Sequence, residues 1–373
     1  MPSGSDERIS SLKQQDKTYN EMYREWSLDK SNDFGFFKRS AEKENTYLAG
    51  EGFVGQYPAA DETAVLHRTI RLVATVMAIY SLLQFLLMLA FSGYPRPLFG
   101  MSICKEGFFI GHGPAPVIMS YAVNAAIRII PVAYLMVKLK APLRIMLPTK
   151  ISNPPLFINS IFFAMLAFGV LYLCLDLQSA ILHTVRDWSH ILLLDKWQRI
   201  PVMILYMLII PVMSEMIHRG IFLNLFRQYG DGFALVLTSL LTAFFSPEGH
   251  FLFMFAFSLL TGYFALRTGS LLTAVMMRVI FSVSYYLITI SRVLSPDKDL
   301  SVIPMAVIIV FIGIGVVATI RFVARYSNRI SLPMYNMFLT DSEKIMMVFS
   351  NPATMVWIMI YIIYIVMSRF IML

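Results

Sequence analysis

Hydrophobic and polar residues alternate along this chain in long blocks. A polar segment reaches to about Arg71, and nine apolar runs follow it. They are predicted at residues 72–91, 117–139, 156–177, 200–218, 232–245, 251–266, 271–290, 303–323 and 354–372. A helix needs about 20 apolar residues to cross a bilayer. The pattern therefore predicts an all-α, polytopic integral membrane helical bundle with about eight to nine transmembrane segments. The two runs nearest residue 250 are the shortest.

The same blocks divide the chain into four predicted parts. Residues 1–71 form a polar N-terminal cytoplasmic tail, and residues 72–200 form the N-terminal transmembrane helices with an interfacial segment. Residues 201–290 form the core helices, and residues 291–373 form the C-terminal transmembrane helices. Within the tail, Asp16 to Lys30 is predicted to be a short amphipathic helix. The tail is expected to pack on the membrane face, and a partner-docking arm is the alternative.

Composition supports the membrane assignment. Of 373 residues 57% are hydrophobic and 14% are charged, and the mean hydropathy is +0.65, which excludes an ordinary soluble domain. The net charge of +8 falls largely in short loops between the apolar runs, so it indicates topology rather than nucleic-acid binding. The bias of Lys and Arg predicts a multi-pass protein of the cell membrane with a cytoplasmic N-terminus. Cys104 and Cys174 are too few for a disulfide framework.

Ionisable residues within the apolar runs are the candidate functional residues, because a charge at membrane depth is costly without a partner. Glu215 and Arg219 are four residues apart and face the same side of a helix. His250 lies in a Pro/Gly break between two apolar runs, with Glu248 beside it as a possible second carboxylate. A carboxylate near a histidine activates water by general-base catalysis.

Two further pairs follow the same spacing. Arg278 and Ser282 are four residues apart on a later helix, and arginine donors can stabilise an oxyanion. Asn124 and Arg128 share one face of the second span, and Arg128 is expected to point into the bundle. For Arg128 an internal salt bridge or a bond to a backbone carbonyl is favoured over a functional role.

Two segments carry a resemblance to a known family. The stretch Ser-Glu-Met-Ile-His-Arg-Gly at 214–220, continuing to Gly230, resembles the first motif of the CPBP family, the CAAX proteases and bacteriocin-processing enzymes also called the Abi family. Residues 262–271 resemble the turn that this family places before its third motif. The resemblance covers about residues 201–286. It implies an intramembrane endopeptidase fold with its catalytic residues on the core helices.

The family pattern carries over at three polar positions. Glu215 corresponds to the second glutamate of the first motif, Arg219 to the motif arginine, and His250 to the histidine of the second motif. The other positions differ from the family pattern. Ser214 replaces the first glutamate, which is thought to activate the attacking water. Position 246 holds serine in place of phenylalanine. Arg278 replaces the third-motif histidine, and Ser282 replaces the asparagine or aspartate four residues later. His218 stands where the family usually has phenylalanine, and it is expected at the membrane interface.

Three functions remain open. The first is an intramembrane endopeptidase that cleaves a membrane-associated peptide or protein with water activated by a carboxylate and His250. The second is a catalytically degraded family member that serves as a scaffold, regulator or bacteriocin-immunity protein. The third, ranked lowest, is a transporter that uses Arg128, Glu215 and Arg278 as a relay. Expected partners are the lipid bilayer and a peptide or membrane protein, with no nucleic acid, no cofactor and no metal, because no helical zinc motif is present. The oligomeric state is not predicted.

Overall fold

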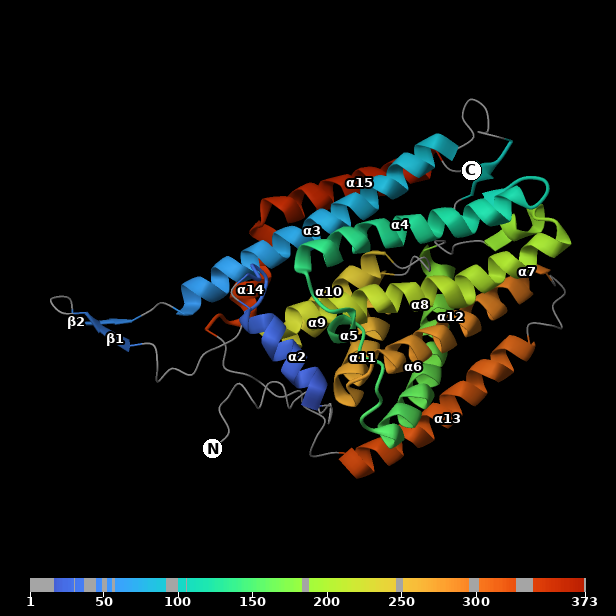
Figure 1. Ribbon diagram of the computed structural model, residues 1–373. Helices are drawn as coiled ribbons and strands as arrows, with labels where there is room; N and C mark the ends of the chain where they lie inside the picture. The colour runs from blue at the N-terminus through green and yellow to red at the C-terminus, as the bar shows by residue number, and fades with distance from the viewer. Residues whose placement is uncertain are drawn as a thin grey trace.

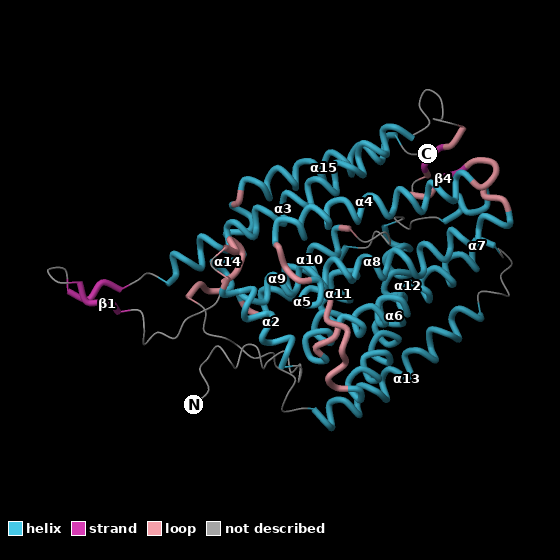
Figure 2. Tube along the Cα trace, in the orientation of Figure 1, coloured by secondary structure: helices cyan, strands magenta, loops and turns pink. Residues whose placement is uncertain are grey.

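The computed structural model places most of the chain in long helices (Figure 1). It describes residues 17–29, 31–36, 45–48, 52–55, 58–91, 100–104, 106–182, 188–245, 251–294, 302–326 and 338–371. Two short antiparallel hairpins accompany the helices, β1 (Asn45–Leu48) with β2 (Gly52–Gly55) and β3 (Ser102–Ile103) with β4 (Phe109–Ile110). The tube in Figure 2 shows how small these strands are beside the helices. The predicted all-α membrane bundle is thereby confirmed.

The helices form a central group with helices packed on either side. On one side lie α3 (Pro58–Phe91), α4 (Ala115–Leu139) and α15 (Pro352–Ile371), and on the other lie α6 (Pro154–Leu182) and α13 (Val302–Tyr326) (Figure 1). The centre holds an interrupted helix over residues 196–229 together with α10 (Asp231–Phe244), α11 (Phe251–Thr268) and α12 (Leu271–Leu294). The shorter helices are α2 (Lys17–Leu28), α5 (Leu143–Met146), the 3₁₀ helix η2 (Trp188–Leu193) and α14 (Asp341–Ser350).

Each of the nine predicted apolar runs lies on a helix. Seven helices in the described part of the chain are long and apolar enough to cross a membrane, and α14 with α15, bent by 62°, forms an eighth if the pair counts as one span. The run at 232–245 corresponds to α10, an apolar helix of 14 residues. At 1.5 Å per residue a helix of that length falls well short of a bilayer core about 30 Å thick. It is therefore a buried helix of the bundle.

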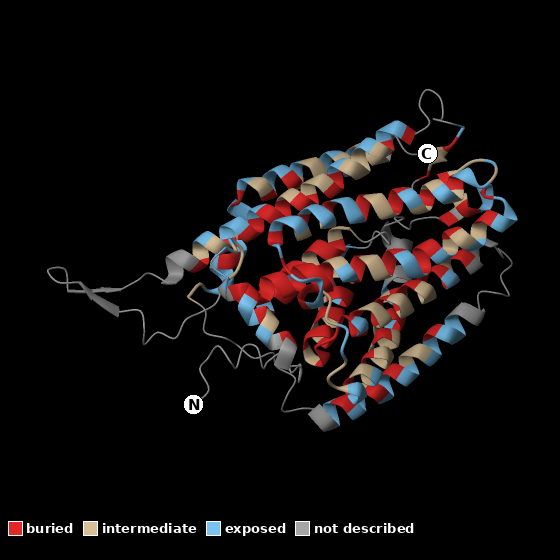
Figure 3. Ribbon diagram, in the orientation of Figure 1, coloured by how far each residue is buried: buried red, intermediate tan, exposed pale blue. Residues whose placement is uncertain are grey.

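The distribution of buried residues follows this arrangement of central and outer helices. Figure 3 shows buried residues concentrated on the central helices, while the outer helices present many exposed apolar side chains. On α13, for example, Ile309, Val317 and Ile320 are more than half exposed. Exposed aliphatic side chains of this kind are ordinary on a surface that faces lipid. The charged residues Glu215, Arg219 and Arg278 lie instead on buried faces.

The N-terminal helix α2 packs against one end of the bundle with three aromatic side chains. The hydroxyls of Tyr19 and Tyr23 donate to the carbonyl oxygens of Ile145 and Asn224, each at 3.0 Å. The indole of Trp26 donates to a carbonyl oxygen near the end of α4, at 3.2 Å. These bonds join α2 to backbone groups at the ends of three other segments. The amphipathic helix predicted at Asp16 to Lys30 is therefore confirmed, and it covers the end of the bundle.

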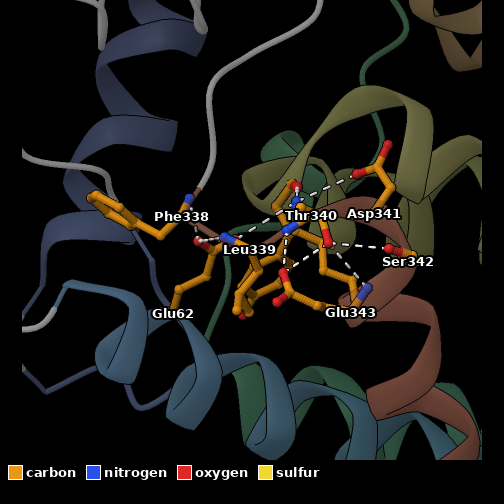
Figure 4. Close-up of polar contacts among 9 residues, drawn as sticks. Glu62, Phe338, Leu339, Thr340, Asp341, Ser342 and Glu343 are labelled. Carbon is orange, nitrogen blue, oxygen red and sulfur yellow. Dashed lines mark hydrogen bonds and ion pairs between the residues drawn. The ribbon is translucent and has the colours of Figure 1, made fainter.

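A buried ion pair fastens α14 to α3. One carboxylate oxygen of Glu62 accepts the backbone N–H groups of Phe338 and Leu339, at 3.0 and 3.2 Å (Figure 4). Its other oxygen lies 3.7 Å from Lys344 Nζ, and both side chains are at least 99% buried. Lys344 also donates to the carbonyl oxygen of Tyr229, at 2.7 Å. The pair therefore links the first span, the last bent pair and the end of the central helix.

Candidate functional site

The candidate site lies on the interrupted central helix. This helix runs through α7 (Lys196–Ile204), the π-helical turn η3 (Leu205–Ile209), α8 (Ile210–Glu215), the π-helical turn η4 (Met216–Phe222), α9 (Leu223–Phe226) and the 3₁₀ turn η5 (Arg227–Tyr229). Pro211 has no N–H for the helical bond to Met207, which lies in the first π turn. Single π turns inside helices are frequent at functional sites. The family-like motif at 214–220 lies across the second of them.

Glu215 and Arg219 form a buried ion pair at this turn. Arg219 Nε lies 3.4 Å from Glu215 Oε2, and both side chains are at least 99% buried. The remaining guanidinium nitrogens are also bound: one Nη donates to the hydroxyl of Thr242 on α10, and the other donates to the carbonyl oxygen of Ser258 on α11, at 2.6 Å. The predicted pairing of Glu215 with Arg219 is therefore confirmed. Arg219 joins three central helices as well as balancing the carboxylate.

Two glycines allow the close packing around this pair. A Cβ on Gly220 would lie 2.5 Å from Leu147 Cδ2 and 3.0 Å from the carbonyl oxygen of Met146. A Cβ on Gly262 would collide with Leu235 and would lie 3.7 Å from Arg219 Nε. Gly220 therefore admits the segment after α5, and Gly262 lets α10 and the guanidinium approach α11. The two family-like segments thus meet around one buried arginine.

Arg278 and Ser282 lie one turn apart on α12, which packs against α8 and both π turns. Arg278 is 1% exposed and Ser282 is fully buried. The guanidinium of Arg278 lies 3.5 Å from Met254 Sδ and 5.9 Å from the centre of the Phe281 ring. The structure therefore places the predicted pair inside the bundle, on a helix that contacts the one carrying Glu215. An arginine keeps its proton in a protein and does not exchange it as a histidine does.

The second predicted motif falls outside the described residues. Residues 246–250, which include Glu248 and His250, lie between α10 and α11 and are not described. Their roles stay predictions. The site as described therefore consists of a carboxylate bound to one arginine, with a second buried arginine and a serine on the neighbouring helix.

A different set of polar side chains faces α3 and α4. His218 Nδ1 lies 2.8 Å from the carbonyl oxygen of Ser214 and 3.3 Å from its hydroxyl. Both residues line a cavity with Arg128, whose Nη1 donates to the carbonyl and side-chain oxygens of Asn124 at 2.9 and 3.0 Å. The prediction that Arg128 bonds a backbone carbonyl is confirmed. His218 is 5% exposed, so it is buried inside the bundle. Its position at the membrane interface stays a prediction.

Sequence reasoning did not bring these three residues together, because they come from helices 86 to 90 positions apart in the chain. Two signals were available: Arg128 is a charge in the middle of a span, and His218 is four residues after Ser214. Neither signal says which helices are neighbours. Among the described residues no group of three His, Cys, Asp or Glu side chains is placed to hold a metal ion.

Comparison with known proteins supports the family resemblance. Residues 196–284 match the family model described as Type II CAAX prenyl endopeptidase Rce1-like. A search of curated proteins and a search of solved structures each found no match. The matched range begins with α7 and ends within α12, so it holds the Glu215–Arg219 pair, Arg278 and Ser282. Residues 196–284 are therefore an Rce1-like domain of the CPBP family, set within a multi-pass membrane bundle.

Proposed function

We propose that this protein is a non-hydrolytic member of the Rce1-like family, which keeps the family's membrane fold and binds a partner within the bilayer. The observation that carries the proposal is the state of Glu215. Its carboxylate is buried against Arg219, and Arg219 is in turn bound to α10 and α11. Removing one partner of a buried ion pair costs about 3–5 kcal/mol, so this pair acts as a structural link. A general base must instead be available to accept a proton.

The substituted positions support the same conclusion. Ser214 stands where the resemblance places the water-activating carboxylate, and its neighbours in the structure are His218 and the cavity toward α4. Arg278 stands where the resemblance places a histidine, and a guanidinium is protonated throughout the physiological range. Ser282 stands where the resemblance places the asparagine or aspartate of an oxyanion site. The residue that would activate water and the residues that would stabilise an oxyanion therefore all differ from the family pattern.

The endopeptidase remains the competing function, with the roles that the sequence suggested. Glu215 or Glu248 with His250 would activate water, and Arg278 with Ser282 would hold the oxyanion. Arg219 would position Glu215. What speaks for it is that the sequence retains Glu215, Arg219 and His250, three residues of the family's motifs. A proteolysis assay separates the two functions.

The test is proteolysis by the purified full-length protein in lipid nanodiscs. The probes are an internally quenched farnesylated peptide ending in a CAAX sequence and a mixture of unprenylated transmembrane peptides, with products detected by mass spectrometry. We expect no cleavage by the wild type or by Ser214→Glu. A triple variant that restores the family pattern, Ser214→Glu with Arg278→His and Ser282→Asn, is expected to gain activity. Cleavage by the wild type that is lost in both Glu215→Gln and His250→Ala would overturn the proposal.

We also propose that the N-terminus faces the cytoplasm. The helix α2 binds backbone groups at the end of α4 and at α5, through Trp26 and Tyr19. That end carries the basic residues Lys138, Lys140 and Arg144. Positive residues near span ends favour the cytoplasmic side. A protease-accessibility assay in sealed inside-out vesicles tests this orientation, and protection of the N-terminal tail there would contradict it.

A further inference from the structure

The end of α4 that α2 contacts, together with the short helix α5, carries three exposed basic side chains. Lys138 lies in the last turn of α4, Lys140 directly follows this helix, and Arg144 lies on α5. Among the described residues no carboxylate lies within 4.0 Å of the side-chain nitrogen of Lys138 or Lys140. We call these three residues the basic platform.

The backbone of Lys140 is in the left-handed conformation. Its φ is 48°, and in the described part of the chain it is the one residue other than glycine with a positive φ. Its N–H donates to the carbonyl oxygen of Met136, at 3.1 Å, and so ends α4. Glycine is the usual residue at such a helix end, because a Cβ is unfavourable there. The chain therefore keeps a cationic side chain where glycine would fit better, and membrane topology does not require the charge at this particular position.

Exposed apolar and aromatic side chains flank the basic platform. Val137, next to Lys138, is 75% exposed, and Leu143, next to Arg144, is 62% exposed. Tyr134, one turn before Lys138, is 38% exposed, and the centre of its ring lies 5.9 Å from Lys138 Nζ. Tyrosines near the end of a span are enriched at the level of the lipid headgroups. The basic platform is therefore placed where the lipid-facing surface of α4 meets the headgroup region.

We infer that the basic platform binds the headgroups of anionic phospholipids. The three cationic side chains attract the negative headgroups, while Val137 and Leu143 contact the upper part of the acyl chains. Basic clusters directly after a transmembrane helix are typical of such binding, and each basic residue strengthens it about fivefold. The inference goes beyond the proposed function. It rests on the proposed orientation in one respect, because anionic lipids are concentrated in the cytoplasmic leaflet.

The surroundings of the basic platform favour a lipid over a soluble anion. Free phosphate or an acidic protein segment would leave Val137 and Leu143 in water, whereas a lipid covers their apolar surface. The exposed carboxylate of Asp29, just after α2, lies close enough to Lys140 to act on it electrostatically. It offsets part of the positive charge of the platform. The charge that remains suits a headgroup with one net negative charge, such as phosphatidylserine.

The test measures lipid preference with the full-length protein in phosphatidylcholine nanodiscs. The discs contain a small fraction of phosphatidylserine or, in a parallel preparation, phosphatidylcholine that carries a diazirine close to the headgroup. After photocrosslinking, the protein is digested with pepsin, which does not depend on Lys or Arg, and labelled peptides are quantified by mass spectrometry. The readout is the ratio of phosphatidylserine to phosphatidylcholine labelling on residues 134–147. We expect a ratio of about ten or more for the wild type.

Variants of Lys140 separate lipid binding from folding. Lys140→Gly and Lys140→Gln should each lower the ratio about fivefold, and the triple variant Lys138→Gln with Lys140→Gln and Arg144→Gln should lower it to about one. Arg321→Gln, which removes an exposed charge from α13 on the other side of the bundle (Figure 1), should leave it unchanged. In thermal unfolding in a neutral detergent, Lys140→Gly should match or exceed the wild type, because glycine accepts the positive φ. A variant that is at least as stable and yet loses lipid preference has lost binding rather than its fold.

The remaining outcomes also decide the question. A wild-type ratio near one, or a ratio that the folded triple variant keeps, would mean that these residues serve topology alone and would overturn the inference. Labelling that soluble glycerol phosphate or a polyglutamate peptide suppresses more strongly than unlabelled phosphatidylserine would instead assign the platform to free phosphate or to an acidic protein segment. Nanodiscs expose both faces of the membrane, so the result does not depend on the orientation. The proteolysis assay decides the non-hydrolytic function separately.

Discussion

The ion pair between Glu62 and Lys344 gives the most direct test of how this bundle is held together. Glu62→Gln removes the negative charge and keeps a side-chain oxygen that accepts the N–H groups of Phe338 and Leu339 (Figure 4). Lys344 Nζ is then left buried, with the carbonyl oxygen of Tyr229 at 2.7 Å and the Asp341 carboxylate at 3.5 Å. The change therefore isolates the loss of one charge.

The size of the effect follows from burial. Breaking a buried ion pair from one side costs about 3–5 kcal/mol, because the remaining charge stays out of water. We expect about 3 kcal/mol for Glu62→Gln, since Asp341 still partly balances Lys344. Lys344→Met should cost a similar amount, because Glu62 keeps its two backbone donors. The double variant should lose much less than the sum, with a coupling energy of about 2 kcal/mol or more.

The assay is equilibrium unfolding in mixed micelles with increasing SDS, followed by the fluorescence of the chain's four tryptophans. A matched control is the exposed pair of Arg68 and Asp33, which lie 3.7 Å apart with side chains 51% and 76% exposed. Arg68→Gln should cost less than about 1 kcal/mol. If Glu62→Gln costs no more than Arg68→Gln, or if the double variant equals the sum of the single ones, the reasoning is refuted.

Three further predictions concern the central helix and the loop before α4. Gly220→Ala should destabilise the fold by about 1–3 kcal/mol in the same assay, because the added Cβ would press on Leu147. The control is Gly313→Ala on α13, where an added Cβ meets nothing within 4 Å, so this variant should be neutral or stabilising. Glu215→Gln should lower stability by about 3–5 kcal/mol, and an unchanged midpoint would show that the Arg219 pair is not a structural link. Burial raises the pKa of the Cys104 thiol well above its usual value. At pH 7.5 maleimide should therefore label Cys104 about tenfold more slowly in the folded protein than in the unfolded protein. The labelling rate of the folded protein should rise at higher pH. Equal rates in the folded and unfolded protein would contradict that burial.

The motif residues show how much of the candidate site could be predicted from the sequence. The spacing of four residues was enough to predict that Glu215 and Arg219 pair, since it places them on one helical face. It did not predict that the same arginine binds α10 and α11, because those contacts depend on which helices are neighbours. The family resemblance located Arg278 and Ser282 but did not give their distances from Glu215. The burial of His218 was not predicted, because one residue in an apolar run does not reveal whether lipid, water or protein faces it.

What the sequence determined by itself is the class of molecule. Apolar runs long enough to cross a bilayer, separated by basic loops, predict a bundle of transmembrane helices. In lipid every backbone N–H and C=O group must be hydrogen-bonded within the protein, and a helix of this length satisfies that requirement. The segments at 214–220 and 262–271, with His250 between them, together indicated the family, since their order and spacing can be read from the sequence. Only the tertiary structure decided that Arg128, Ser214 and His218 face one cavity, and that Glu62 meets Lys344 from 282 residues away. Such contacts arise because helices that are distant in the sequence pack together. Whether a buried charge has a partner of opposite charge therefore depends on which helices are neighbours.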